Sequence, residues 1–275
     1  MSAAGKKSIG AILLHSYGIW FLVYLMLPLL VMVGAAFNNS PKLPSPLPWQ
    51  GFTLRFFPDL FAIESLWGWN GGVMHTIIVA IFVVVLAVPI GTAGAILINN
   101  LKGRSRVILY AVMIAPVLTP GVVIGIATLQ FWFSFDVPAG LHLSALGQVS
   151  FIAAYVMLMV LARLQSFDPG LEEAALDLGA THGRVLRRIL MPHLTPALIT
   201  GAILAFFQSV ENFNVTQFTR GQSETLMVYF GSRGRSGVSP TICALAVILI
   251  AMTIVGEIIF EIWRRRAEAK RQAVV

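Results

Sequence analysis

Long apolar stretches separated by short charged segments run along the whole chain. About 20 mostly apolar residues are needed for a helix to cross the roughly 30 Å hydrocarbon core of a bilayer. Six stretches of at least 18 residues contain no Asp, Glu, Lys or Arg: 8–41, 65–101, 107–135, 137–162, 189–210 and 236–256. Turn-forming residues trim these stretches, and the sequence predicts six transmembrane helices, near 14–36, 73–98, 107–133, 143–162, 194–212 and 239–262. The period-two alternation of membrane β-strands is absent, so the predicted fold class is an all-α integral membrane protein.

Composition agrees with this pattern and narrows the function classes. The 275 residues are 57% hydrophobic and 11% charged, with a mean hydropathy of +0.82. A water-soluble chain usually carries about 25% charged residues, so a cytosolic enzyme is excluded. A disordered chain is excluded as well, because disorder goes with low hydrophobicity. The single cysteine, Cys243, can form neither an intrachain disulfide nor a cysteine-rich metal site.

The distribution of Lys and Arg predicts the orientation of the helices. The segments on one side of the predicted membrane hold 14 of these residues and those on the other side hold 5. Basic residues concentrate in cytoplasmic loops, so both termini, 1–13 and 263–275, are predicted to be cytoplasmic. The formal charge of +7 is then a consequence of topology, and nucleic acid is not expected as a partner. The first apolar run is longer than the core of a signal peptide, so 14–72 is predicted to be a retained helix and a periplasmic loop.

The connection 163–193 has amphipathic structure of its own. Asp168 followed by Pro169 is a helix start, and Gly179 suits the left-handed position after a helix end. Thr181 can cap a second helix. Small and apolar residues share one face of the first helix at three- and four-residue spacing: Leu171, Ala174, Ala175 and Leu178. Arginines mark one side of the second: Arg184, Arg187 and Arg188. Two interpretations follow from these residues alone, a hairpin lying on lipid headgroups and an element that docks a partner protein.

The spacing within this connection is similar to a known motif. Glu173-Ala174-Ala175, then Gly179, Ile189 and Met191-Pro192 resemble the EAA loop of ABC importer permeases, with Met191 in place of the family's leucine. Pro116-Val117-Leu118-Thr119-Pro120-Gly121 also looks like that family. The resemblance implies a type I permease core over 73–262, with a coupling loop at 163–193 and a coupling helix over 168–183. The residues implied to couple the chain to an ATPase are Glu173, Ala174, Ala175, Gly179, Ile189 and Pro192.

The same resemblance implies an assembly in a bacterial inner membrane. It consists of two copies of a separate ATPase that holds ATP and magnesium, a second and related permease subunit, and a periplasmic solute-binding protein, all in contact with membrane lipid. The chain contains no Gly-x-x-x-x-Gly-Lys-Ser/Thr phosphate loop, so ATP cannot bind to it by that route. We expect a transport subunit without catalytic residues, a metal site or a cofactor of its own.

A polar tract lies in the outer half of the fifth predicted helix. It contains Gln208, Glu211, Asn212, Asn214 and Thr216. One interpretation is a helix that emerges into a periplasmic loop. The other is a polar lining for a solute path, in which Glu211 attracts a cation, because a carboxylate in or near a membrane normally faces a cavity or a partner.

The stretch 207–218 resembles the spermidine/putrescine branch of the permeases. Members of that branch often carry adjacent acids where this chain has Glu211-Asn212. The resemblance implies import of a polyamine-like cation by alternating access, while related branches transport opines, amino-acid derivatives, aminophosphonates or ferric iron. The alternative function is an ion-coupled secondary transporter or channel with an interfacial cytoplasmic hairpin. That alternative predicts ion ligands near mid-membrane, and the first four predicted helices offer hardly any.

Overall fold

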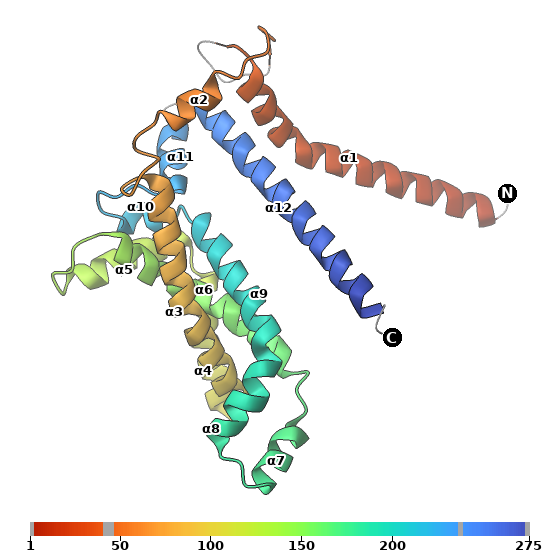
Figure 1. Cartoon of the computed structure of the whole chain (residues 1–275), viewed down its shortest axis with the longest axis vertical. Coiled ribbons are helices and arrows are strands. Elements are labelled where there is room, and N and C mark those ends of the chain that lie inside the picture. Colours follow the sequence, from red (N-terminus) through yellow and green to blue (C-terminus); the bar gives the residue numbers. More distant parts are fainter. Residues whose placement is uncertain (1–2, 41–46, 236–238, 273–275) are drawn as a thin grey trace. The chain divides into compact units, whose positions relative to one another are not determined.

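The computed structural model of the chain describes residues 3–40, 47–235 and 239–272. Apart from one isolated antiparallel bridge between Asn38 and Phe52, the described parts contain helices and loops. The helices pack into two compact units, 64–231 and the two terminal segments 1–63 and 232–275 (Figure 1). The predicted all-helical class is therefore confirmed.

The unit of residues 64–231 contains most of the helices. In chain order they are α3 Gly72–Asn100, α4 Gly103–Leu118, α5 Gly121–Phe133, α6 Leu141–Leu164, α7 Pro169–Asp177, α8 His182–Val185, a π-helical turn Leu186–Leu190, α9 Met191–Val210, α10 Thr216–Thr219 and α11 Leu226–Arg235, which extends beyond the unit. Helices α3, α6 and α9 run side by side and form its centre (Figure 1).

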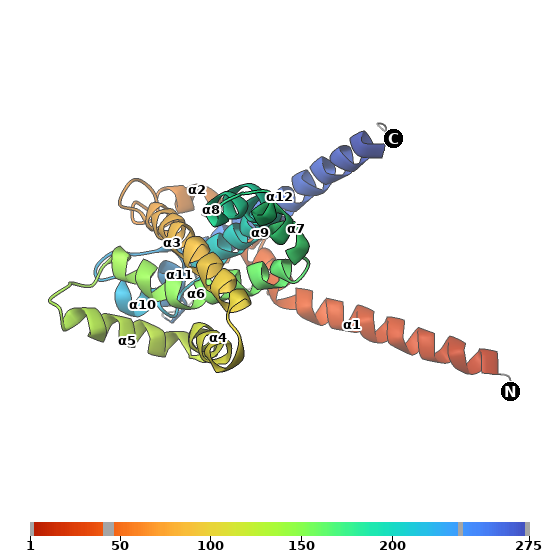
Figure 2. The ribbon, with the colours of Figure 1, turned by 90° about the horizontal axis from the view of Figure 1, so that it is seen from below.

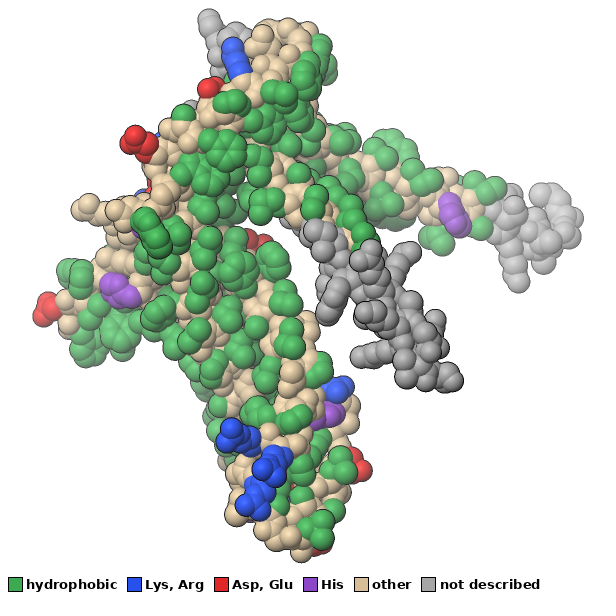
Figure 3. All heavy atoms as spheres, in the orientation of Figure 1, with side chains coloured by type: hydrophobic (Ala, Val, Ile, Leu, Met, Phe, Trp, Pro, Cys, Tyr) green, Lys and Arg blue, Asp and Glu red, His purple; other side chains and the backbone are tan. Residues whose placement is uncertain are grey.

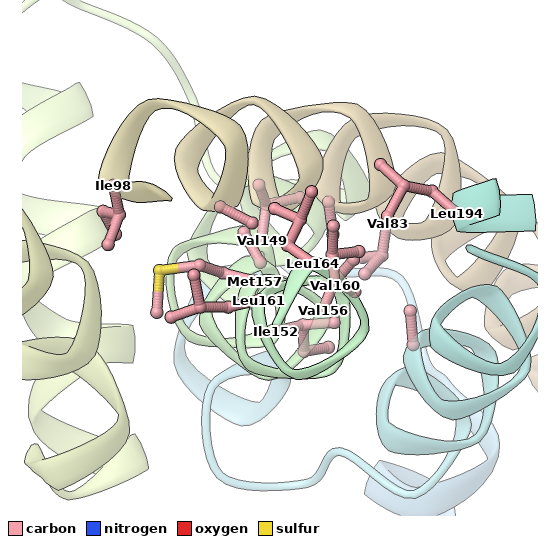
Figure 4. Packing of buried hydrophobic residues seen from close by; sticks show 14 of the residues in the cluster. Val83, Ile98, Val149, Ile152, Val156, Met157, Val160, Leu161, Leu164 and Leu194 are labelled. Carbon is pink, nitrogen blue, oxygen red and sulfur yellow. The ribbon is translucent and has the colours of Figure 1, made fainter. Parts of the chain in front are cut away.

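Helix α6 is the central element of this unit. Of its apolar window 61% is buried, against 28% for α3. Its core residues Val149, Val156 and Val160 pack with Val83 of α3 and Leu194 of α9 (Figure 4). Because α6 is covered on several sides, polar residues on it must find partners inside the protein.

A glycine allows α3 to approach α6 closely. A Cβ atom at Gly91 would collide with the carbonyl oxygen of Ala153, and it would lie 2.8 Å from the Val156 Cβ. Only a residue without a side chain fits at this crossing, which is how small residues bring membrane helices together.

The single helix predicted over 107–133 is wrong. The chain forms α4 and α5 instead, which are bent by 106° at a break around Thr119 and Pro120, as Figure 2 shows. A proline disfavours helical backbone at the preceding residue, and Thr119 accordingly has an extended conformation with φ −89° and ψ 132°. Pro120 itself is extended with ψ 132° and directly precedes α5.

The fifth predicted helix, near 194–212, corresponds to α9, Met191–Val210, but the helical run that contains it begins earlier. A single helical run continues from His182 to Val210, so Pro192 lies within the helix and not before it. Proline has no N–H to donate, and the helix widens just before it. The Met191 N–H donates to the carbonyl oxygen of Leu186, five residues back, in a π-helical turn of the kind often found at functional positions. Thr181 occupies the N-cap position without a capping side-chain hydrogen bond, so the predicted cap is not formed.

The unit of the terminal segments contains α1 Ala3–Phe37, α2 Phe56–Phe61 and α12 Pro240–Gln272. Helix α12 contacts both α1 and α2, with Ala35, Ala36 and Cys243 buried together. The loop after α1 is held by Asn38, whose Nδ2 donates to the Pro48 carbonyl oxygen (3.0 Å) and whose Oδ1 accepts from the Gln50 N–H (2.7 Å). The helix predicted near 14–36 lies inside α1. The one predicted near 239–262 begins one residue before α12, which continues ten residues beyond its predicted end.

Several helices could cross a membrane. Among the described residues, four are long and apolar enough, and α4 with α5 would make a fifth if the bent pair is one span. The apolar described part of α12, Pro240–Met252, is shorter than a span requires. The chain is thus a multi-pass helical protein, while the sixth span, the orientation of the termini and the predicted domain boundaries stay predictions.

Candidate solute path and coupling loop

The polar tract after α9 forms a loop that folds back into the unit. Helix α9 ends at Val210, and residues 211–215 lead into α10, which packs against α5 and α6. The Asn212 side chain stabilises this return, because its Oδ1 accepts from the Val215 N–H (3.1 Å) and from the Thr216 N–H (3.4 Å). An asparagine at such a position supplies the acceptor that the first turn of a helix lacks.

A cavity of about 330 Å³ lies where this loop meets the bend between α4 and α5. Helix α6 contributes Phe151 and Tyr155 to its wall. The α4–α5 side contributes Pro116, Val117, Thr119, Gly121 and Ile124, and the loop side contributes Gln208, Glu211, Asn212, Phe213 and Asn214. Four of the five residues predicted for the solute path therefore line one cavity.

Glu211 is exposed at this cavity, and its carboxylate has no partner among the residues that the structure describes. Within the described parts of the chain, no hydrogen bond or ion pair engages its side chain, nor those of Gln208 and Asn214. Unpaired polar groups around a concave surface can bind a polar ligand. Glu211 is the one charged residue among the described residues that line the cavity.

Thr216, the fifth predicted residue, does not line the cavity. Its side chain is 1% exposed, and its Oγ1 accepts a hydrogen bond from Gln148 Nε2 (2.8 Å). It belongs to the packing beneath the cavity.

Sequence reasoning missed the two cavity residues that α6 contributes, Phe151 and Tyr155. They are four residues apart and so share a face of α6. The available signal was Tyr155, an aromatic residue with a hydroxyl group in a helix otherwise dominated by aliphatic residues. That signal is weak, because membrane helices commonly contain tyrosine.

The start and end of α7 agree with the sequence analysis. Asp168 Oδ1 accepts from the Gly170 N–H (2.9 Å), and Pro169 is the first helical residue. Gly179 has φ +84°, its N–H donates to the Leu176 carbonyl oxygen (2.8 Å), and the Ala180 N–H donates to that of Ala175 (3.0 Å). These two hydrogen bonds form the Schellman motif that ends many helices. The helix, however, covers Pro169–Asp177 and not the predicted 168–183.

Helix α7 has an exposed surface. Glu173 and Ala174 are exposed, Ala175 is half-buried, and Leu178 is 89% exposed. Gly179 is exposed as well, and nothing would lie within 4 Å of a Cβ atom there. The other two predicted coupling residues lie at the far end of the loop: Ile189 in the π-helical turn and Pro192 in the first turn of α9. Leu171, seven residues before Leu178 and on the same face, is 54% exposed, so this face of α7 carries two exposed leucines beside small residues.

The two ends of the coupling loop are tied together. Arg163 Nε donates to the His193 carbonyl oxygen (3.1 Å), and His193 Nε2 lies 3.3 Å from the Arg163 carbonyl oxygen. The Phe167 ring packs edge-on against the His193 ring. Exposed basic residues of α8 and the π-helical turn lie nearby in the sequence, and Lys and Arg side chains gather at that end of the unit (Figure 3).

The class of protein follows from a comparison with known families. The sequence profile of the family described as "Binding-protein-dependent transport system inner membrane component" matches residues 87–272. The chain belongs to this family. Membership favours the predicted importer over the ion-coupled secondary transporter or channel.

Particular relatives narrow the similarity. The chain is 31% identical to the putrescine transport system permease protein PotI of Escherichia coli K12 over 263 residues, which cover 91% of this chain and 89% of the relative. It is 28% identical to the spermidine/putrescine transport system permease protein PotC of Haemophilus influenzae, covering 88% and 93%. The chain is therefore similar to polyamine permeases over nearly its full length.

Solved structures share the fold. A chain of a bacterial alginate ABC transporter, crystallised in complex with an alginate pentasaccharide-bound periplasmic protein, matches with a TM-score of 0.71 at 17% identity, covering 93% of each chain. An amino acid ABC transporter solved with histidines matches with a TM-score of 0.52 at 20% identity, covering 78% of this chain and 96% of that one. The fold is thus that of ABC transporter membrane subunits.

Proposed function

We propose that the chain is the permease subunit of an ATP-driven importer in a bacterial inner membrane and that it forms part of the path for a polyamine-like cation. The observation that supports this best is the unpaired Glu211 carboxylate at a cavity of about 330 Å³. Importer relatives named for putrescine and spermidine agree with a cationic solute. They favour a polyamine over the opines, amino-acid derivatives, aminophosphonates and ferric iron of related branches.

The cavity offers three kinds of group to an ammonium ion. Glu211 supplies charge, and Gln208 and Asn214 supply amide oxygens. Tyr155 and Phe151 add aromatic rings, whose faces attract cations. A single carboxylate suits one ammonium group at a time. A diamine would thus be held by one end, and its other end would depend on the companion subunit.

Energy for transport enters through α7. We propose that the exposed surface of α7, with Glu173, Ala174 and Gly179, docks on a separate ATPase that holds ATP and magnesium. Leu178, at the end of that surface, would bury its side chain in the partner. The π-helical turn and the ties between Arg163 and His193 would then transmit movement of the loop to α6 and α9.

The complete importer contains more than this chain. We propose two ATPase copies, a second and related permease subunit, and a periplasmic solute-binding protein that delivers the solute. The chain itself would cross the membrane six times with both termini in the cytoplasm, and the whole would work by alternating access. The basic residues of the loops support this orientation.

The test is uptake by the reconstituted importer. Proteoliposomes that contain the four-subunit complex, ATP and solute-loaded binding protein should accumulate radiolabelled putrescine. Glu211→Gln should reduce the uptake rate about tenfold, which corresponds to about 1.4 kcal/mol and is typical of a lost charged contact. Assembly of the complex should not change.

A matched control replaces a carboxylate elsewhere in the same unit. Glu64 is exposed and does not line the cavity, so Glu64→Gln should transport as the unsubstituted protein does. Equal uptake by the Glu211→Gln and Glu64→Gln proteins would remove Glu211 from the solute path. Uptake of a neutral polar solute in preference to putrescine would contradict the cationic assignment.

A further inference from the structure

A buried amide lies beneath the cavity. Gln148 of α6 is 0% exposed, yet it lies three residues before Phe151 and seven before Tyr155, on the face of α6 that lines the cavity. A side-chain amide is costly to bury unless both its oxygen and its nitrogen are hydrogen-bonded. Gln148 meets this requirement through two partners that lie on opposite sides of the cavity loop, residues 211–215.

The two hydrogen bonds of Gln148 hold both ends of this loop. Ser209, in the last turn of α9, donates its hydroxyl to Gln148 Oε1 (2.6 Å). Gln148 Nε2 donates to the Oγ1 of Thr216, the first residue of α10 (2.8 Å). The Thr216 hydroxyl in turn lies 3.4 Å from Asn212 Oδ1, so the chain of hydrogen bonds continues into the loop. Hydrogen bonds in such a buried chain strengthen one another.

Close packing holds the end of the same loop. A Cβ atom at Gly147 would lie 2.8 Å from Val215 Cγ1, and one at Gly125 would lie 3.0 Å from the Val215 carbonyl oxygen. Val215 itself is fully buried. The loop therefore cannot shift toward α5 or α6. The Gln148 amide, through its hydrogen bonds to the residues at the two ends of the loop, limits the remaining movement of the side chains that face the cavity.

We propose that Gln148 is a positioning residue for the cation site. It touches no solute, but it fixes the separation of Ser209 and Thr216 and thereby the direction in which Glu211, Asn212 and Asn214 face the cavity. This inference rests on the proposed function, because it presupposes that a cation binds at this cavity. Solute affinity should then depend on a residue that lies outside the cavity wall.

The experiment measures solute binding at the cavity in the assembled importer. Asn214 is exposed at the cavity, and the native Cys243 is buried, so Asn214→Cys combined with Cys243→Ala gives this chain one reactive thiol. A positively charged methanethiosulfonate reagent labels this thiol, and intact-mass spectrometry of the chain measures the labelled fraction. Putrescine bound at the cavity should protect the thiol from labelling. Half-protection is the putrescine concentration that halves the labelling. Gln148→Leu should raise it about tenfold, which corresponds to a loss of about 1.4 kcal/mol of binding free energy.

The matched control breaks a comparable buried hydrogen bond between two side chains outside residues 211–215. Thr219 Oγ1 donates to Ser144 Oγ (2.9 Å), and both side chains are 0% exposed, one helical turn from the Gln148 contact. The control leaves in place the other contact of the Thr219 hydroxyl, with the Val215 carbonyl oxygen (3.0 Å). Ser144→Ala should lower the melting temperature, as Gln148→Leu should, but it should leave half-protection within about twofold. A purely structural role of Gln148 predicts that both variants shift protection equally or that neither does.

Each remaining outcome separates this inference from the proposed function. Unchanged half-protection in Gln148→Leu would overturn the positioning role while leaving the cation site intact. Should Gln148→Leu fail to assemble, Ser209→Ala removes one of the two hydrogen bonds and should raise half-protection about threefold; no shift would overturn the role. Absence of protection in the Asn214→Cys background, together with absence of putrescine uptake by the unsubstituted importer, would overturn the solute path and this inference with it.

Discussion

Helix α7 and the cavity loop are both short polar interruptions next to long apolar helices, but they are held in different ways. Every bond that shapes α7 joins residues within five positions of one another, from the Asp168 cap to the Gly179 turn. The cavity loop is held by Gln148, which lies 61 residues before Ser209 and 68 before Thr216. A locally determined element keeps its shape while its surroundings move, and this suits a docking helix. A loop held from a distance changes when the helices move, and this suits a path that opens and closes.

The substitution with the largest expected effect distorts the end of α7 and leaves the rest of the unit unchanged. Gly179→Leu places a side chain at φ +84°, where an L-residue costs roughly 1–2 kcal/mol, and it adds bulk to the docking surface. Insertion should persist, while putrescine uptake should fall by more than about tenfold and ATP hydrolysis should no longer be coupled to it.

The control for this variant is Gly183→Leu. Gly183 is also exposed with open space around it, but its φ is not positive. Uptake by the Gly183→Leu importer should stay within about twofold of the unsubstituted protein. If both leucine variants transport normally, α7 does not couple the chain to an ATPase.

The next effect concerns the apolar end of α7. Leu178→Ala removes an 89% exposed side chain, so the chain's own stability should change by less than about 0.5 kcal/mol. Burying such a leucine in a partner contributes about 1.5–3 kcal/mol, so the dissociation constant for the ATPase should rise at least about tenfold. Surface plasmon resonance on detergent-purified permease measures it. Leu118→Ala, at an 80% exposed leucine of α4, should leave the dissociation constant unchanged.

A smaller effect is expected from substitutions of the two capping residues, Asp168 before α7 and Asn212 before α10. Asp168→Ala and Asn212→Ala each remove a side-chain acceptor from the start of a helix, at a cost of about 1 kcal/mol. Hydrogen exchange should rise only within α7 for the first variant. For the second it should rise in 211–215 and α10 together, because that loop shares hydrogen bonds with Thr216. Exchange changes that spread beyond α7 in the Asp168→Ala protein would contradict its local character.

The smallest effect concerns the cavity wall. Tyr155→Phe removes a hydroxyl that has no partner among the described residues but keeps the ring. Water can take the place of this uncharged hydroxyl in the cavity, so its loss should cost about 0.5–1.5 kcal/mol and reduce uptake about two- to tenfold. Tyr155→Leu, which also removes the ring, should reduce it further. A leucine variant that transports as well as the phenylalanine variant would exclude a cation–π contribution.

This contrast also explains what the sequence could predict. The α7 caps were predictable because Asp168-Pro169 and Gly179 act on their own neighbours. Pro116 and Pro120 indicated an interruption, but the 106° bend depends on how α5 packs against α6 and α10. The helix through Pro192 was missed because a π-helical turn accommodates the proline.

The cavity was predictable only in part. Gln208, Glu211, Asn212 and Asn214 could be found because they are close in sequence and polar. Thr216 shares that pattern, yet its hydroxyl is taken by Gln148, a pairing across 68 residues that no local pattern indicates. Gln148 and Tyr155 were missed for the same reason, since only the folded unit brings them beneath and beside the loop.

One measurement tests the central claim most directly, which is that α7 docks on a separate ATPase. Ala174 is exposed on α7, so Ala174→Cys in a Cys243→Ala chain can be crosslinked in native membranes and purified through an affinity tag. We predict a covalent adduct with an ATPase that contains a phosphate loop, strongly reduced by Gly179→Leu and not by Gly183→Leu. Recovery of this chain with lipid alone, and with no ATPase before or after crosslinking, would contradict the account and identify the loop as a membrane-surface hairpin.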